Sequence, residues 1–282
     1  MDVKELFLLT RFEHALMLAL AVLIGETIVL GAFPPIDRIL ALSLLVPIFS
    51  EMGSFSLNDY LDIETDRLNK RMDRPLVRGT ITKGFALWFS ILCLAASVIF
   101  AFFINANAFL IALIFGALAV AYDWKLKDLP LVGNVYIGFT MAIPFIFGNF
   151  VYSGVLLPIA LALSALGFVA GLAREIIKSV QDMEGDREAR GSKTIPIVIG
   201  KGPSLAVASV LYLLFIPLSA LPFIMDLPQK MPALALVAIA DALILGIALR
   251  IITQGEKAAG FAKSASLIAF FIGLIGLLVA AI

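Results

Sequence analysis

The stretch Asn58–Asp66, NDYLDIETD, decides how the rest of the sequence is interpreted, because it joins an apolar run at residues 37–57 to a basic segment. Asn58, Asp62 and Asp66 are four positions apart, so on a helix their side chains lie above one another on one face. Carboxylate and amide oxygens are ligands that suit Mg²⁺, with substrate phosphates and water completing its shell. The stretch therefore predicts a metal site at the end of an apolar helix.

A second acidic pair occurs much later, where Asp182 and Asp186 repeat the four-residue spacing and Lys178 precedes them by four positions. Acidic residues also cap helix N-termini, so one such cluster alone could be a solvated cap. Two clusters with the same spacing, each at the edge of an apolar segment and each followed by basic residues, favour a shared site.

The composition indicates that lipid is the main solvent of the chain. The 282 residues are 61% hydrophobic and 15% charged, with a mean hydropathy of +1.05. A soluble globular protein is about half apolar and a quarter charged. The net charge is zero, which argues against a nucleic-acid partner. The single cysteine, Cys93, excludes an intrachain disulfide.

The apolar segments predict an all-α, multi-pass membrane protein, because runs of about 17–25 apolar residues span a bilayer as helices. We expect one transmembrane domain over residues 1–282, composed of two pseudo-equivalent parts at about 1–125 and 126–282. Nine spans are expected, at residues 12–32, 37–57, 83–104, 107–124, 131–151, 154–176, 203–223, 231–252 and 263–282.

The distribution of positive charge predicts the orientation in the cell membrane. With the N-terminus inside, all of the 21 Lys and Arg residues except Arg38 and Lys230 fall on the cytoplasmic side. Such an asymmetry follows the positive-inside rule. Both acidic clusters then face the cytoplasm, which supplies Mg²⁺ and soluble phosphate compounds.

Basic residues near the clusters are candidates for binding a diphosphate held by the metal. Positive-inside charge accounts for some of them, but cations beside carboxylates can also contact non-bridging phosphate oxygens. Tyr122 and the two following lysines have a further explanation as ordinary residues of the membrane interface. The candidates are Arg67, Lys70, Arg71, Arg74, Lys125, Lys127 and Lys178.

Glu51 lies on the predicted face of Asn58, Asp62 and Asp66, about two turns deeper in the membrane. An ionisable group inside a span is costly and usually lines a wet cavity. We expect Glu51 to line a central cavity that opens near the cytoplasmic side, although a protonated carboxyl between helices is an alternative. Arg11 is among the basic residues available to bind the phosphate of a phosphorylated acceptor.

These motifs resemble the UbiA superfamily of intramembrane prenyltransferases. The first family motif, N-D-x-x-D-x-x-x-D, corresponds to Asn58, Asp59, Asp62 and Asp66, and the second, D-x-x-x-D, to Asp182 and Asp186. The resemblance implies an isoprenyl-synthase-like bundle in which Asn58 and the four aspartates bind Mg²⁺, and those aspartates and Tyr122 are catalytic. The family's Y-x-x-x-K element departs here, because Lys125 and Lys127 flank Leu126.

Within the superfamily, the stretch TRFEHALMLALAVLIGE at residues 10–26 is similar to archaeal digeranylgeranylglyceryl phosphate synthases. That similarity implies transfer of a geranylgeranyl group from its diphosphate to geranylgeranylglyceryl phosphate, in a membrane lipid pathway. An aromatic acceptor such as 4-hydroxybenzoate or a quinone precursor is an alternative. An ion-coupled transporter is a candidate of another class, but its sites would lie near the bilayer midplane.

Overall fold

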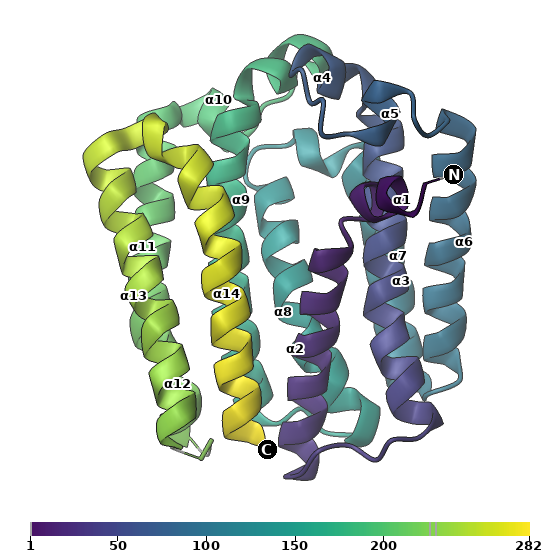
Figure 1. Cartoon of the computed structure of the whole chain (residues 1–282), viewed down its shortest axis with the longest axis vertical. Helices are drawn as coiled ribbons and strands as arrows, with labels where there is room; N and C mark the ends of the chain where they lie inside the picture. Colours follow the sequence, from purple (N-terminus) through teal and green to yellow (C-terminus); the bar gives the residue numbers. More distant parts are fainter. Residues whose placement is uncertain (1, 226, 229) are drawn as a thin grey trace.

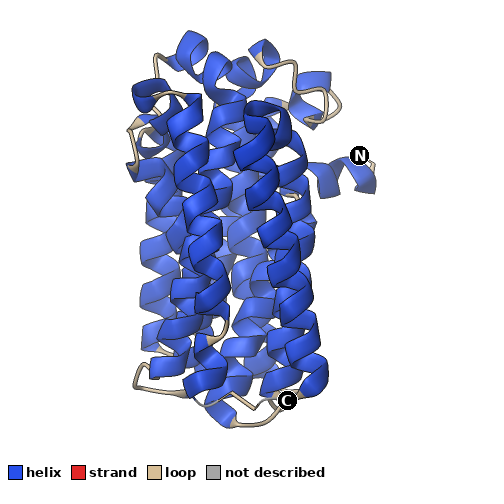
Figure 2. Ribbon diagram, turned by 90° about the vertical axis from the view of Figure 1, so that its left-hand side faces the viewer, coloured by secondary structure: helices blue, strands red, loops and turns tan. Residues whose placement is uncertain are grey.

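The computed structural model describes residues 2–225, 227–228 and 230–282, and in these ranges every regular element is a helix. Figures 1 and 2 show the long helices standing nearly side by side in one bundle. Their sequences are apolar over most of their length, and a helix satisfies its own backbone groups in lipid. The long helices are α2 (Phe12–Leu30), α3 (Arg38–Leu61), α6 (Lys83–Phe102), α7 (Ala106–Trp124), α8 (Val132–Tyr152), α9 (Pro158–Arg190), α11 (Lys201–Ser219), α13 (Met231–Gln254) and α14 (Ala259–Ala281).

Each expected span overlaps one of these long helices. Within the described residues, eight helical segments are long and apolar enough to cross a membrane, and the last of them, Met231–Ala281, contains both α13 and α14. A 3-10 turn, η2 (Gly255–Ala258), separates these two helices, which lie side by side in Figure 1. The multi-pass membrane architecture is confirmed, whereas the count of nine crossings and the division into two parts stay predictions.

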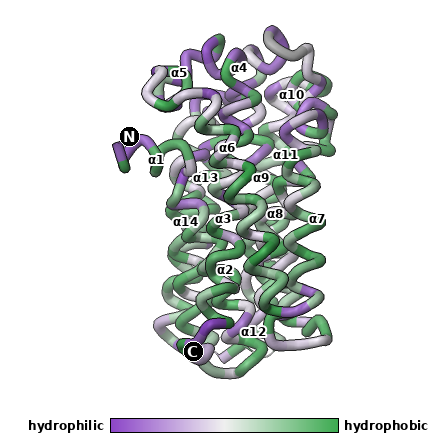
Figure 3. Tube along the Cα trace, turned by 90° about the vertical axis from the view of Figure 1, so that its right-hand side faces the viewer, coloured by the Kyte–Doolittle hydropathy of each residue, from purple (hydrophilic) through white to green (hydrophobic). Residues whose placement is uncertain are grey.

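Short helices and polar loops cover one end of the bundle. Figure 3 shows hydrophilic residues concentrated at this end and hydrophobic residues along the shafts below it. The α9 helix is longer than expected, because it continues past residue 176 and carries Asp182 and Asp186 beyond the apolar part. The short elements at this end are α4 (Ile63–Leu68), α5 (Pro75–Arg78), η1 (Leu126–Asp128) and α10 (Ile195–Ile199), while α12 (Leu221–Met225) follows α11 at the other end.

The first helix, α1 (Val3–Thr10), projects from the bundle near its polar end (Figure 2). Arg11, which joins α1 to α2, has φ of 44°, a left-handed conformation that is uncommon for a residue with a side chain. Glu5 accepts a hydrogen bond of 2.6 Å from Arg78 and another from Thr80, both of which follow α4. These contacts fasten α1 to the polar cap.

The α2 and α8 helices approach closely and form a wall through the middle of the bundle. A Cβ atom at Gly148 would lie 2.2 Å from the carbonyl oxygen of Val22, and one at Gly25 would lie 2.7 Å from that of Phe145. Glycine at both positions therefore permits backbone contact between the helices. The wall separates apolar space on the α3 side from apolar space on the α14 side.

Candidate active site

The first acidic motif lies at a bend rather than on one straight helix. The α3 helix ends at Leu61 and α4 begins at Ile63, so the prediction of a single helix through Asp66 was wrong. The four-residue hydrogen bonds persist, however, from Asp62 N–H to Asn58 O at 2.9 Å and from Asp66 N–H to Asp62 O at 2.8 Å. The three side chains therefore stay near one another at the polar end of α3.

Asp123 at the end of α7 and Lys127 in the following turn both contact the first motif. The Asn58 Nδ2 donates to Asp62 at 3.0 Å and to Asp123 at 2.8 Å. Lys127 Nζ donates to Asp62 Oδ1 at 2.6 Å and lies 3.5 Å from Asp123 Oδ1. Because Lys127 is 7% exposed, the ammonium group is held inside the site.

Asp59 contacts the cationic side chains of Arg11 and Arg74. Its Oδ1 accepts from Arg11 at 2.6 Å and lies 3.9 Å from Arg74 Nε. Arg74 Nε is also 3.9 Å from Asp66 Oδ2. Burial, together with the nearby Arg11, lowers the pKa of Arg74 to about 10, and burial raises the pKa of Asp66 to about 6 despite that arginine. Two arginines are thus gathered beside the first motif.

The second acidic motif on α9 faces the first across the same polar mouth. Arg71 Nη1, in the segment that follows α4, lies 3.4 Å from Asp182 Oδ1. Gly185 packs on the side chain of Asn69, where any Cβ atom would lie only 2.1 Å from Oδ1. Asp182 and Asp186 therefore stand beside the end of the α4 segment, although more than a hundred positions separate the motifs in sequence.

An apolar cavity with a few polar groups extends below the first motif, and we call it the Glu51 cavity. It has a volume of about 560 Å³ and is lined from α2, α3, α6, α7 and α8. Ser54 and Glu51 line it one and two turns below Asn58 on α3. Tyr136 also lines it and stacks on Tyr122 with ring centroids 4.8 Å apart.

Several expected diphosphate-binding residues are exposed or pair with a glutamate of their own helix. Arg67 is half exposed and pairs with Glu64 at 2.9 Å, and Lys70 and Lys125 are exposed. Lys178 pairs with Glu175 on its own helix at 3.1 Å. Of the two lysines after Tyr122, the structure brings only Lys127 to the first motif. The contacts made by Asp59 and Asp123 were not predicted, since they join segments 48 and 65 positions apart.

The donor set suits Mg²⁺ held jointly with a substrate. Within the described part of the chain, no three acidic, histidine or cysteine side chains gather around one point. Mg²⁺ usually takes one or two carboxylates from the protein and completes its shell with substrate phosphates and water. Paired carboxylates on two facing helices, each beside a lysine or arginine, fit that requirement.

A multi-pass helical bundle with two aspartate motifs at one polar mouth, above an apolar cavity, defines an intramembrane enzyme class that acts on prenyl diphosphates. The chain belongs to the UbiA prenyltransferase family, whose model matches residues 17–279. The expected fold class and the prenyltransferase assignment are thereby confirmed.

Similar proteins agree with this assignment along nearly the whole chain. Digeranylgeranylglyceryl phosphate synthase of Archaeoglobus fulgidus is 35% identical over 280 residues, which cover 97% of this chain and 94% of the relative. A solved structure of a digeranylgeranylglyceryl phosphate synthase matches with a TM-score of 0.73 at 30% identity, over 99% of this chain and 98% of that one. A UbiA homologue from A. fulgidus, bound to GPP and Mg²⁺, shares the fold with a TM-score of 0.67 at 23% identity, over 97% and 99% of the chains.

Proposed function

We propose that this protein transfers a geranylgeranyl group from geranylgeranyl diphosphate to geranylgeranylglyceryl phosphate, with Mg²⁺ as cofactor. The product would be an ether lipid, and diphosphate would be released. The observation that carries the proposal is the meeting of the two aspartate motifs at the mouth of an apolar cavity. The name shared by the 35% identical relative and the 30% identical solved structure supports the choice of acceptor.

Asn58, Asp62 and Asp66 would hold one Mg²⁺, and Asp182 and Asp186 would hold a second. Bound Mg²⁺ supplies positive charge that neutralises the diphosphate as it departs. Lys127, Arg71 and Arg74 surround the same mouth and would bind the remaining phosphate oxygens. These side chains are already held in place by carboxylates, so little reorganisation is needed when charge develops on the leaving group.

The Glu51 cavity would hold the prenyl chain below its diphosphate. Its lining is mainly apolar, which keeps water from an allylic cation after the carbon–oxygen bond breaks. The stacked Tyr122 and Tyr136 lie between the aspartates and this cavity, and would place an aromatic ring beside the cation. The acceptor hydroxyl would then attack the allylic carbon and lose its proton.

We also propose that the polar end faces the cytoplasm, because nearly all of the positive charge gathers there. Purified protein given geranylgeranyl diphosphate, Mg²⁺ and either geranylgeranylglyceryl phosphate or 4-hydroxybenzoate tests the reaction itself. Product is expected with the first acceptor and little or none with the second. Prenylation of 4-hydroxybenzoate alone would reject the proposed acceptor, and no prenyl transfer to either would reject the proposal altogether.

A further inference from the structure

The turn that carries Lys127 is held from two sides. On one side, the first turn of α8 packs directly on it, since a Cβ atom at Gly133 would lie 2.9 Å from the Cα atom of Lys127. On the other side, the loop that follows α9 bonds to the next residue, Asp128. The carbonyl oxygen of Asp128 accepts from Lys193 N–H at 2.9 Å, and its Oδ1 accepts from the Ser192 hydroxyl at 2.7 Å. The position of the Lys127 ammonium group therefore depends on both α8 and the chain after α9.

The loop after α9 also bonds to the second aspartate motif, because the helix ends just beyond it. Gly191 has φ of 61°, a left-handed conformation that reverses the chain at the end of α9. Ser192 N–H then donates to the carbonyl oxygen of Asp186 at 3.2 Å. Ser192 is 4% exposed, so its hydrogen bonds are sheltered from water. One serine thus joins the backbone of the second motif to the residue after Lys127.

A second hydrogen bond joins the same two parts of the chain just below the second motif. Asn134, in the first turn of α8, donates from Nδ2 to Oγ of Ser179 on α9 at 2.9 Å. The two residues are 4% and 8% exposed, so this bond is also buried. Ser179 lies three positions before Asp182, about one helical turn. The segment that follows Lys127 is therefore bonded to the chain both before and after the second aspartate pair.

From these contacts we infer that Ser179 and Ser192 are positioning residues, which set the distance between the Lys127 ammonium group and the second aspartate pair. The inference rests on the proposed function and deepens it, because both groups would bind the same diphosphate, the lysine directly and the aspartates through Mg²⁺. Lys127 and Asp182 are 55 positions apart in sequence, so tertiary contacts must hold them at the same mouth. Charged groups stabilise a departing anion best when they are already held where its charge develops.

The same two helices carry a matched hydrogen bond far from the mouth. Ser164 on α9 is 3% exposed and donates to the carbonyl oxygen of Ala142 on α8 at 3.1 Å. It lies 15 positions before Ser179, or about 22 Å along the helix. Loss of the Ser164 hydroxyl should therefore remove a comparable contact between α8 and α9 without moving Lys127. The S164A variant consequently serves as the control for S179A and S192A.

Binding of the non-reactive analogue geranylgeranyl thiodiphosphate tests the inference without an acceptor. It is measured by isothermal titration calorimetry on detergent-purified protein with Mg²⁺. We expect S179A and S192A each to weaken binding about fivefold, and S164A to change it less than about twofold. Wild-type affinity in both S179A and S192A would overturn the inference. An equal loss in S164A would also overturn it, because the effect would then come from general packing of α8 on α9.

The same measurement in the K127A background shows whether the two serines act through the lysine. Once the ammonium group is absent, S179A and S192A should each weaken thiodiphosphate binding by less than about twofold. Losses of about fivefold in both backgrounds would overturn the inference, because additive effects indicate that the serines and the lysine act independently.

Steady-state kinetics then connect the inference with the proposed reaction. For S179A and S192A, kcat/KM for geranylgeranyl diphosphate should fall about fivefold, while the KM for geranylgeranylglyceryl phosphate stays within about twofold. Wild-type protein that shows the expected binding results but transfers no prenyl group to either acceptor would reject the proposed function and leave the inference standing. Normal prenyl transfer by the wild type, together with unchanged thiodiphosphate binding in S179A and S192A, would do the reverse.

Discussion

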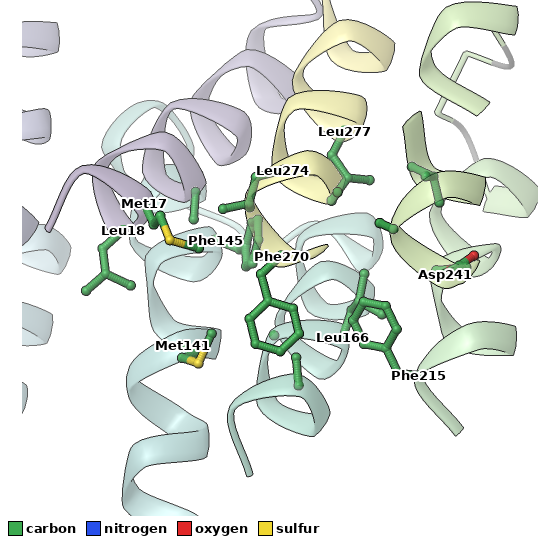
Figure 4. A pocket seen from close by; sticks show the side chains of 17 residues that line it. Met17, Leu18, Met141, Phe145, Leu166, Phe215, Asp241, Phe270, Leu274 and Leu277 are labelled. Atoms are coloured by element: carbon green, nitrogen blue, oxygen red, sulfur yellow. The ribbon is translucent and has the colours of Figure 1, made fainter. Parts of the chain in front are cut away.

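Two apolar cavities lie on the two sides of the α2–α8 wall: the Glu51 cavity, and a second one lined by residues such as Phe145, Asp241 and Phe270 (Figure 4). Asn58 and Asp62 lie above the Glu51 cavity, where each nearby cation, such as Lys127 or Arg74, has a carboxylate within 4 Å. The second cavity has Asp241 in its lining, and Ser219 donates a hydrogen bond of 2.7 Å to that carboxylate. A mouth that combines carboxylates with lysine and arginine can bind an anion together with a divalent metal ion. The difference supports placing the proposed metal-bound diphosphate at the mouth of the Glu51 cavity.

Removing carboxylates should produce the largest effect. D62A and D182A each take one metal-binding group from the mouth, and we expect prenyl transfer to fall by on the order of 10²–10³-fold or more. The measurement is incorporation of labelled geranylgeranyl at saturating Mg²⁺. E64A is the matched control, because the Glu64 side chain is exposed and pairs only with Arg67 among the described residues. Near-normal turnover in either aspartate variant would contradict the metal assignment.

Alanine variants of Lys127 and Lys125 should differ in activity, although the two lysines lie only two positions apart. K127A removes an ammonium group that is 2.6 Å from Asp62, so kcat/KM for the diphosphate should fall roughly 10–100-fold. K125A removes an exposed side chain and should change it less than about twofold. The comparison fails if K125A has the larger effect, because Lys125 would then have to reach the diphosphate in place of Lys127.

The wall between the cavities should be sensitive to a single methyl group. Gly148→Ala would place a Cβ atom 2.2 Å from Val22 O, so we expect unfolding to become easier by about 1–3 kcal/mol. Thermal unfolding in detergent, followed by intrinsic fluorescence, measures the change. Gly84→Ala in α6 is the control, because no atom lies within 4 Å of its added Cβ and alanine favours a helix. Equal stability of both variants would argue against close α2–α8 packing.

Much of the fold was predictable because lipid imposes simple rules on sequence. Long apolar runs such as 83–104 had no alternative to helices, and α6 covers nearly that range. Glu51 and Asn58 are seven positions apart, about two helical turns, and both belong to α3. Periodicity could not predict the bend at Asp62 or the separate α1 helix, because both depend on packing against other segments.

The pairing of residues across the site was less accessible from sequence. Nothing local to Asp123 indicates that Asn58 donates to it, and nothing local to Arg11 indicates that it binds Asp59. Span six also looked complete by residue 176, so the α9 extension that carries Asp182 was underestimated. These contacts are tertiary, and they determine which of many basic residues face the mouth. The type of chemistry was therefore easier to predict from the sequence than the set of residues that line the site.

The most direct test of the central claim is an experimental structure with a non-reactive geranylgeranyl thiodiphosphate and Mn²⁺ in place of Mg²⁺. Anomalous scattering would locate the metal independently of the phosphorus atoms. The account predicts metal and diphosphate between Asp62 and Asp66 on one side and Asp182 and Asp186 on the other, with the prenyl chain in the Glu51 cavity. A diphosphate or a metal bound away from both aspartate pairs would contradict it.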